Sequence, residues 1–525
     1  MITDIGNGSF FPHQLISGEL VGKTIDIPST IVLLIATALV LLMVPGLGIF
    51  YGGLERRKNV STIIAQSLIT IPIVTLIWIF GGFSLAFGTS AGGVIGNPTD
   101  YFAFRNILFS NGWGTPRLIT NITLANGVPF IVFFLFQLSF AIITPALVSG
   151  AFADRLKFRG YVLFTILFTI FIYIPVCHWI WGGGWLSNGG ALDWAGGVVI
   201  HITCGAAAVS SVLVLKKRTI MNYELSAPHS LPLVSIGAAL LFFGWFGFNT
   251  GGATFTSYAF TSDNILQTII ENGTLLPANN QQLWIGVNAF INSFISMSIA
   301  MLIWALIDLC FKKRISLLSI LTAGIAGLAT ITPAAGFVPV WASLIFGFAG
   351  GSICYTMCYL NHKIHFDDAL EVWPVHGIGG LVGSILVSGL ATIMVNANLG
   401  TTQGLNSTNQ LGSVHLLLTQ LIMILVVTAW TFIFSIGIFY LAILIKGRTT
   451  KDEEIEGLDK TLLGEDSYSK GINLNKINET SIAAQDSIKT GTNKLNNSKN
   501  NSSIKSKKSK TNNKITLKSS SKNKI

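Results

Sequence analysis

The chain contains a series of long apolar stretches, and these limit its fold more than any other feature. A helix needs roughly 20 apolar residues to cross the hydrocarbon core of a bilayer. The predicted spans are residues 31–52, 60–87, 127–152, 160–181, 194–215, 231–250, 283–309, 316–336, 338–360, 370–394 and 414–445. Composition agrees, because 51% of the 525 residues are hydrophobic and only 11% are charged. The sequence therefore predicts an all-α polytopic membrane protein with eleven transmembrane helices.

Basic residues between the spans predict the orientation of the chain. Clusters of Lys and Arg follow the odd-numbered spans, at residues 55–58, 154–159, 216–218, 312–314, 361–365 and 446–448. Cytoplasmic loops carry an excess of these residues. We therefore predict an extracellular N-terminal segment (1–30), a transmembrane domain (31–448) and a cytoplasmic tail (449–525). Sequons at Asn121, Asn272 and Asn406 lie in connections predicted to be outside and indicate a glycoprotein.

The net charge of +10 is unevenly distributed. Residues 449–525 hold 15 of the 33 Lys and Arg and 9 of the 23 Asp and Glu, which leaves 18 basic and 14 acidic residues, or +4, for the rest. This balance gives no support for a nucleic-acid partner. From about residue 487 the tail is rich in Lys, Asn and Ser, so we predict that it is disordered and attracted weakly to anionic lipid.

The five cysteines lie in or beside apolar spans and show no CxxC or CxxCH spacing. We therefore expect no disulfide framework, no zinc or other metal site, no attached haem and no cofactor. The cysteines are predicted to be small buried apolar residues.

An acid, a histidine and a glycine recur at the same spacing in two predicted spans. Asp193, His201 and Gly205 occur in span 5, and the same spacing recurs at Asp368, His376 and Gly380 in span 10. Each of these spans closes a set of five. An odd number of helices per half places the second half upside down in the membrane, as in many transporters. The sequence thus predicts an inverted repeat of spans 1–5 and 6–10, followed by a final helix.

The repeat predicts where these side chains lie. Eight residues of helix rise about 12 Å, so each histidine lies deeper in the membrane than its acid, and His201 and His376 should meet near the midplane. Both acids are candidate N-caps, and Glu371, three residues after Asp368, has the spacing of a capping box. Packing would explain one buried histidine, but two at matching positions favour a functional role.

Several motifs in order resemble the ammonium transporter family, which includes methylammonium permeases and, more distantly, Rhesus-type proteins. They are PGLGIFYGG (45–53), FQLSFAIITPALVSGAFADR (136–155), PVCHWIWGGGWL (175–186), DWAGGVVIHITCG (193–205), GWFGFNTGG (244–252), ITPAAGFV (331–338) and DDALEVWPVHGIGG (367–380). The resemblance implies a homotrimer in the lipid bilayer, with one pore per subunit between the two five-helix halves. It also implies ammonium or ammonia as the substrate, with methylammonium as a second one, and a transporter rather than an enzyme. The plasma membrane is the expected location, with internal vesicle membranes as the alternative.

The resemblance also assigns roles to residues. Trp181 and Phe140 correspond to the aromatic walls of an outer ammonium site, and Phe140 and Phe248 to two rings that close the pore. The complete set of expected transport residues is Phe136, Gln137, Phe140, Trp181, Asp193, His201, Phe248 and His376. Two positions depart from the family pattern: Gly252 replaces a serine at the outer site, and Leu463 replaces a histidine in the regulatory part of the tail.

The chemistry of these residue types suits ammonium. Aromatic faces attract a cation by about 0.5–2 kcal/mol, whereas an unpaired ion is far more costly than neutral ammonia inside an apolar pore. We therefore expect ammonium to lose its proton before it passes through the pore, with His201 and His376 as part of a proton relay. The negative charge of Asp193 is expected to favour cations at the outer mouth of the pore. The alternatives are a neutral gas channel, an ammonium sensor with the tail as its output, and a membrane haem enzyme ligated by the two histidines.

Overall fold

The computed structural model describes residues 25–468, except 26, 108–127, 220–227, 256–277, 397–398, 406 and 408–409. The asparagines of the three sequons, nearly all of the predicted N-terminal segment and the tail beyond Tyr468 lie outside the described residues. Residues up to Ser467 belong to one compact unit, which therefore includes the first part of the predicted tail.

Within the described residues, ten helical segments are long and apolar enough to cross a membrane. They are Ile27–Leu54, Val60–Phe87, Phe130–Val148, Phe158–Asn188, Gly197–Leu215, Leu231–Ala253, Trp284–Lys312, Ala342–Ile364, Trp373–Leu390 and Val414–Leu444. The predicted span at 316–336 forms a shorter apolar helix, α12 (Leu317–Ile331). The helical, polytopic fold class is confirmed, while the count of eleven spans and the orientation of the termini stay predictions.

Half of these segments consist of more than one element. In chain order the elements are α1 (Ile27–Leu54), α2 (Val60–Ile77), η1 (Trp78–Gly82), α3 (Phe83–Phe87), β1 (Ser90–Ala91), β2 (Ile95–Gly96), η2 (Phe102–Phe104), α4 (Phe130–Val148), α5 (Phe158–Phe168), η3 (Thr169–Tyr173), α6 (Ile174–Ile180), α7 (Trp185–Asn188), η4 (Gly197–Ile202), α8 (Thr203–Leu215), α9 (Leu231–Thr250), η6 (Gly251–Phe255), α11 (Ala278–Lys312), α12, α13 (Ala342–Ile364), η7 (Trp373–Gly377), α14 (Ile378–Leu390), η8 (Thr401–Gln403), α15 (Val414–Leu444), α16 (Lys451–Glu456) and η9 (Asp459–Leu463).

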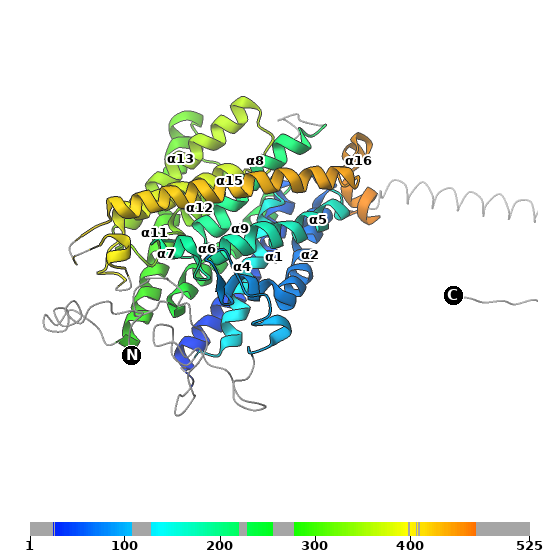
Figure 1. Ribbon diagram of the computed structural model, residues 1–525. Coiled ribbons are helices and arrows are strands. Elements are labelled where there is room, and N and C mark those ends of the chain that lie inside the picture. The colour runs from blue at the N-terminus through cyan, green and yellow to red at the C-terminus, as the bar shows by residue number, and fades with distance from the viewer. Residues whose placement is uncertain are drawn as a thin grey trace, which may run out of the picture. The chain divides into compact units, whose positions relative to one another are not determined.

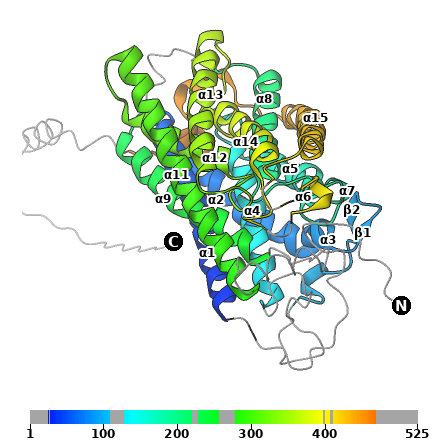
Figure 2. The ribbon, with the colours of Figure 1, turned by 90° about the vertical axis from the view of Figure 1, so that its left-hand side faces the viewer.

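The helices lie side by side in one bundle, with α15 along its surface and α16 just beyond the end of α15 (Figure 1). α1 packs along α9, and these two helices carry the related motifs 45–53 and 244–252. Figure 2 shows β1, β2, α3 and α7 together at one side of the bundle, where the antiparallel pair β1–β2 contacts the ends of α3 and α6.

The two histidine-bearing segments begin with a wide π-helical turn instead of a regular α-helix. His201 lies in η4, which follows Gly196 in a left-handed conformation (φ 114°), and His376 lies in η7. Such turns occur often at functional sites, because the extra residue per turn redirects a side chain. The residue pattern did not predict these turns.

Charged loops from distant parts of the chain meet at one end of the bundle, which we call the basic end. Asp154 pairs with Arg56 at 2.6 Å, and Arg218 pairs with Asp367 at 2.7 Å. Fully buried Arg155 donates to the backbone carbonyl of Asp367 at 2.8 Å. These residues come from connections that the sequence predicts on a single side of the membrane. Their contacts agree with that grouping.

The first part of the tail also docks at the basic end. Buried Asp459 accepts hydrogen bonds from the backbone N–H groups of Ser61 (3.1 Å) and Thr62 (2.7 Å), in the first turn of α2. A carboxylate at a helix N-terminus is stabilised by the unpaired N–H groups and by the helix dipole. Glu454 pairs with Arg448 and accepts from the backbone N–H of Thr219 at 2.6 Å. The segment from Thr449 to Ser467 is therefore attached to the membrane domain.

Candidate functional site

The two histidines of the repeat meet inside the bundle. Their Nδ1 atoms are 3.2 Å apart, and the rings lie nearly parallel, with centroids 5.1 Å apart and an interplanar angle of 19°. A neutral imidazole has one donor nitrogen and one acceptor nitrogen. A hydrogen bond between the two Nδ1 atoms therefore requires opposite tautomers: one ring has an acceptor Nε2, and the other has an Nε2–H donor.

The glycines of the repeat allow this meeting. A Cβ atom added to Gly205 would lie 2.2 Å from the Cα atom of Gly377, in the turn that carries His376. A Cβ added to Gly380 would lie 2.3 Å from the carbonyl oxygen of Gly197 and 2.9 Å from the Cβ of His201. Only a residue without a side chain permits such close backbone contact. The third position of the repeat thus brings the two segments together.

Aromatic side chains lead from Trp181 to the histidine pair. The ring centroid of Trp181 is 5.9 Å from that of Phe140, which meets Phe248 edge to face at 4.5 Å and 77°. Phe248 lies in turn against His201, at 6.1 Å and 21°. All four side chains are buried. We call the row Trp181, Phe140, Phe248, His201 and His376 the conduit.

Of the other predicted residues, Phe136 lies beside the conduit and Gln137 follows it in α4. The Phe136 ring contacts Phe140 at 4.7 Å. Gln137 is buried, and its Oε1 atom has no hydrogen-bond partner within the described part of the chain. The structure thus brings the predicted aromatic residues and histidines into one row, with Phe136 on its flank.

Trp245 also belongs to this site, although it was not among the residues predicted from the sequence. Its ring lies against His201 at 5.3 Å and is nearly parallel to His376 at 6.4 Å and 4°. The indole N–H donates to Thr332 Oγ1 at 2.9 Å, which fixes the ring. Its position three residues before Phe248 places it on the same helix face, and this spacing is the signal that could have identified it.

Asp193 caps the turn that leads to His201, as the sequence predicted. Its carboxylate accepts four backbone N–H groups at 2.7–2.9 Å, those of Gly196, Gly197, Val198 and Val199. Burial raises the pKa of Asp193 to about 6, while the four N–H groups act in the opposite direction. Each oxygen already has two donors. The indole N–H of Trp181 donates to the backbone oxygen of Asp193 at 2.8 Å, which joins this turn to the conduit.

Asp368, the counterpart of Asp193, is bonded differently. Its Oδ2 accepts the backbone N–H of Trp373 at 2.6 Å, whereas its buried Oδ1 has no hydrogen-bond partner within the described residues. The predicted capping box with Glu371 is wrong. Glu371 has a left-handed backbone (φ 61°), and its side chain turns away to pair with His362 at 3.0 Å. The helical turn starts later than the spacing implied, at Trp373.

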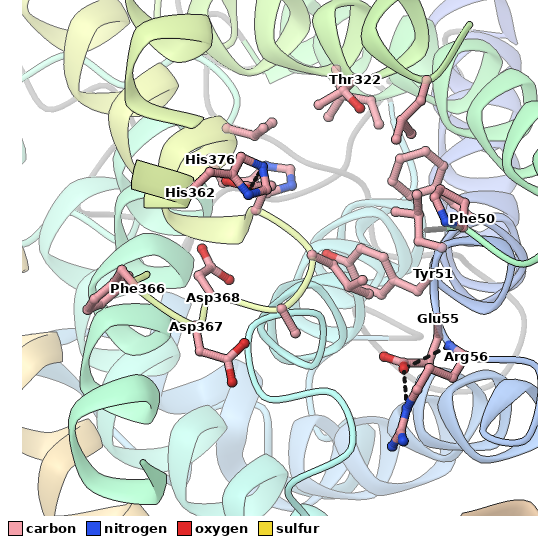
Figure 3. A pocket seen from close by; sticks show the side chains of 18 of the residues that line it. Phe50, Tyr51, Glu55, Arg56, Thr322, His362, Phe366, Asp367, Asp368 and His376 are labelled. Atoms are coloured by element: carbon pink, nitrogen blue, oxygen red, sulfur yellow. Dashed lines mark hydrogen bonds and ion pairs between the residues drawn. The ribbon is translucent and has the colours of Figure 1, made fainter. Parts of the chain in front are cut away.

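A cavity of about 180 Å³ connects the basic end with the histidine pair (Figure 3). Its lining includes His376, Asp368 and Glu371 together with Tyr51 and Glu55. His376 is 5% exposed, whereas His201 is fully buried. The pair is therefore reached through this cavity on one side and covered by the rings of Phe140 and Phe248 on the other.

The side chain of Trp194 lies next to Gly252, the position at which the family pattern has a serine. A Cβ added to Gly252 would lie 3.2 Å from the indole Cε2 of Trp194, closer than ordinary van der Waals contact. The indole N–H of Trp194 donates to the backbone oxygen of Asn249 at 2.6 Å, which holds the ring there. The indole therefore leaves little room for a side chain at position 252.

A bundle of apolar helices around a buried row of aromatic rings and paired histidines defines a membrane transport protein. Comparison with known proteins identifies the family: a model described as Ammonium Transporter Family matches residues 31–468, and this chain belongs to that family. The chain is 36% identical to an ammonium transporter of Aquifex aeolicus, over 85% of this chain and 94% of the relative. It is 37% identical to Ammonium transporter Amt1 of Archaeoglobus fulgidus, over 83% and 98%.

Solved structures agree with this assignment. Mep2 of Saccharomyces cerevisiae has a TM-score of 0.69 and 28% identity, over 84% of this chain and 92% of that one. A structure titled Sensor Amt Protein has a TM-score of 0.68 and 25% identity, over 82% and 97%. Family membership identifies a multi-pass membrane transporter and not an enzyme, which excludes the haem-enzyme alternative.

Proposed function

We propose that this chain moves ammonium across a membrane along the conduit, with His201 and His376 carrying the proton that ammonium loses. The observation that carries this proposal is the Nδ1–Nδ1 contact of the histidines, at the point where the aromatic row meets the cavity of the basic end. Methylammonium, which has the same cationic head, is expected to follow the same route.

The aromatic part of the conduit suits the first step. The faces of Trp181 and Phe140 attract a cation, and this attraction is about 2 kcal/mol or more in a desolvated site. Beyond them, the rings of Phe140 and Phe248 are in contact, so passage requires them to swing apart. A bare cation is too costly in such an apolar passage, whereas ammonia is neutral. Deprotonation at this boundary lets the nitrogen continue as ammonia.

The histidine pair can transfer the proton with every bond accounted for. In one tautomeric state, His201 Nε2 is an acceptor, and it has no hydrogen-bond partner within the described residues. An N–H bond of ammonium breaks, and the proton joins this nitrogen. The Nδ1 proton of His201 then crosses to His376, and the Nε2–H bond of His376 releases a proton into the cavity. The net result is one ammonia and one proton on the far side.

Alanine substitutions at His201 and His376 test the proposal. Each should reduce ammonium-evoked current at least tenfold at equal surface expression, because the Nδ1–Nδ1 bridge is lost. His415→Ala is the matched control, since His415 is an exposed histidine at the start of α15, a helix that contains no conduit residue, and it should leave the current unchanged. If the histidine variants conduct like the wild type, the conduit is not the transport path.

Current also separates the proposal from a neutral gas channel. At a fixed ammonia concentration, a current that rises with ammonium indicates charge transport, and its absence indicates passage of gas alone.

We further propose that the basic end faces the cytoplasm at the plasma membrane and that the protein assembles as a homotrimer. Native mass spectrometry would measure the stoichiometry, and protease access in sealed vesicles would measure the orientation.

A sensor function is a second candidate, favoured by the similarity to the structure titled Sensor Amt Protein. The docked tail segment would then transmit the state of the conduit. Deleting residues 469–525 should abolish a signalling output while leaving uptake intact if the protein is a sensor. A variant that keeps both activities would contradict this candidate.

A further inference from the structure

The two acids of the repeat differ in how fully their oxygens are bonded. Asp193 has both oxygens occupied, each by two backbone N–H groups. Asp368 is equally buried, at 5% exposure against 3% for Asp193, but its Oδ1 has no partner within the described residues. A buried carboxylate oxygen without a donor is costly unless it is protonated or bonded to water or a ligand. This asymmetry distinguishes two residues that the repeat would treat as equivalent.

The Oδ1 atom of Asp368 belongs to a residue that lines the same cavity as His376. In the view of Figure 3 the carboxyl group of Asp368 lies between His376 and Asp367. A volume of about 180 Å³ has room for several water molecules, and the polar side chains around it offer them hydrogen bonds. A proton released from His376 therefore enters a space in which an acceptor oxygen is available.

We propose that Asp368 is the proton-exchange group on the basic side of the histidine pair, and that Asp193 is a structural cap. This inference rests on the proposed function and assigns the residue that receives the proton. The Nε2–H bond of His376 breaks, and the proton passes through cavity water to form an O–H bond on Asp368 Oδ1. That O–H bond then breaks as the proton passes to ammonia, which leaves the cavity as ammonium. No other reactant is needed.

The charges around Asp368 suit this exchange. Burial, followed by the nearby carboxylate of Glu371, raises the pKa of Asp368 to about 7. The backbone N–H groups of Trp373 and Val372, and after them Arg155 from the α4–α5 connection, act in the opposite direction. Tyr51 on α1 and Cys358 on α13 also face Asp368. A carboxyl group with a pKa near neutrality exchanges protons readily in both directions, unlike one with an ordinary value of about 4.

Asp368→Asn in the full-length protein is the direct test. The Asn side chain can keep the acceptor for the Trp373 N–H but cannot exchange a proton. We expect ammonium-evoked current, recorded by whole-cell patch clamp at equal surface expression, to fall at least tenfold. Asp368→Ser, which also keeps an N-cap acceptor, is the second variant should the first fail to reach the surface. Glu55→Gln is the matched control, because Glu55 is a second buried carboxylate in the lining of the same cavity, and it should leave the current unchanged.

The pH profile separates proton exchange from a structural effect. The accepting form is the carboxylate, so wild-type inward current should fall as the pH on the side of the basic end drops through about 7. Asp368→Glu should retain this dependence, and the residual current of Asp368→Asn should lack it. Wild-type current and pH profile in Asp368→Asn would overturn the inference, while loss of current in His376→Ala would still uphold the proposed function. Absence of any current in the wild type would instead overturn charge-coupled transport itself.

Discussion

Gly205→Ala should separate the histidine pair without altering either imidazole. A methyl group at this position would meet the Cα atom of Gly377 at 2.2 Å, whereas carbon atoms in contact lie about 3.5 Å apart or more. The two backbones must therefore move apart by about 1.3 Å. The Nδ1 atoms are now 3.2 Å apart, and the same displacement takes them beyond hydrogen-bond distance.

The expected loss is large for transport and moderate for stability. A displacement of about 1 Å in a reacting pair can reduce a rate about 100-fold, whereas an extra methyl group in a packed core costs about 1–3 kcal/mol. Gly205→Ala should therefore reach the membrane and unfold at a somewhat lower temperature, with most of its ammonium-evoked current lost. Patch clamp and thermal unfolding of the purified protein would measure the two effects separately.

Gly389→Ala is the control for this prediction. Gly389 lies in α14, the helix that follows the turn of His376, and a Cβ there would meet no atom within 4 Å. This variant should conduct like the wild type. A fully active Gly205→Ala protein at normal expression would refute the reasoning, because it would mean that the proton transfer does not need the close contact of the two segments.

Two further predictions concern Gly252 and the tail. Gly252→Ser alone should lower the thermal stability, because the new side chain crowds Trp194. The double variant Gly252→Ser with Trp194→Phe should recover the stability and lower the half-saturating ammonium concentration a few-fold, since the hydroxyl adds an acceptor for ammonium. Equal stability of the single variant and the wild type would contradict this account. In Asp459→Asn a single side-chain oxygen replaces the carboxylate that accepts the N–H groups of Ser61 and Thr62. A hydrogen bond to a charged group contributes about 1.5–3 kcal/mol, so the segment should detach more often. Proteases should therefore cleave residues 449–467 at least tenfold faster than in the wild type. Unchanged cleavage would show that Asp459 does not hold the segment.

The apolar spans were predictable because crossing a bilayer is a local requirement. Each helix must satisfy its own backbone and present about 20 apolar residues to the lipid, and both conditions are visible along the chain. The span at 316–336 is the instructive exception. Its helix, α12, covers only Leu317–Ile331, because Thr332 and Pro333 lead into the turns before α13, and hydropathy alone does not resolve such turns.

The meeting of the histidines was also predictable. In an inverted repeat the two copies enter the membrane from opposite sides, so residues at equal depth in each copy lie near the same plane. The resemblance to known transporters then named the aromatic residues in front of them. Trp245 was missed, although its spacing to Phe248 was available. Its importance depends on a ring-to-ring contact with His201 at 5.3 Å across two helices, and a spacing within one helix does not specify such a contact.

The sequence alone was sufficient for ten of the eleven predicted membrane spans, the repeat of acid, histidine and glycine, and the family to which they point, since these depend on residue type and spacing. Only the tertiary structure distinguished the two acids. In Asp193 the left-handed Gly196 and the π turn aim four N–H groups at one carboxylate. The left-handed Glu371 delays the turn after Asp368, and one oxygen of that carboxylate has no hydrogen-bond partner among the described residues. The two sites have the same residues at the same spacing, but the path of the backbone and the residues packed around it decide which oxygen finds a donor.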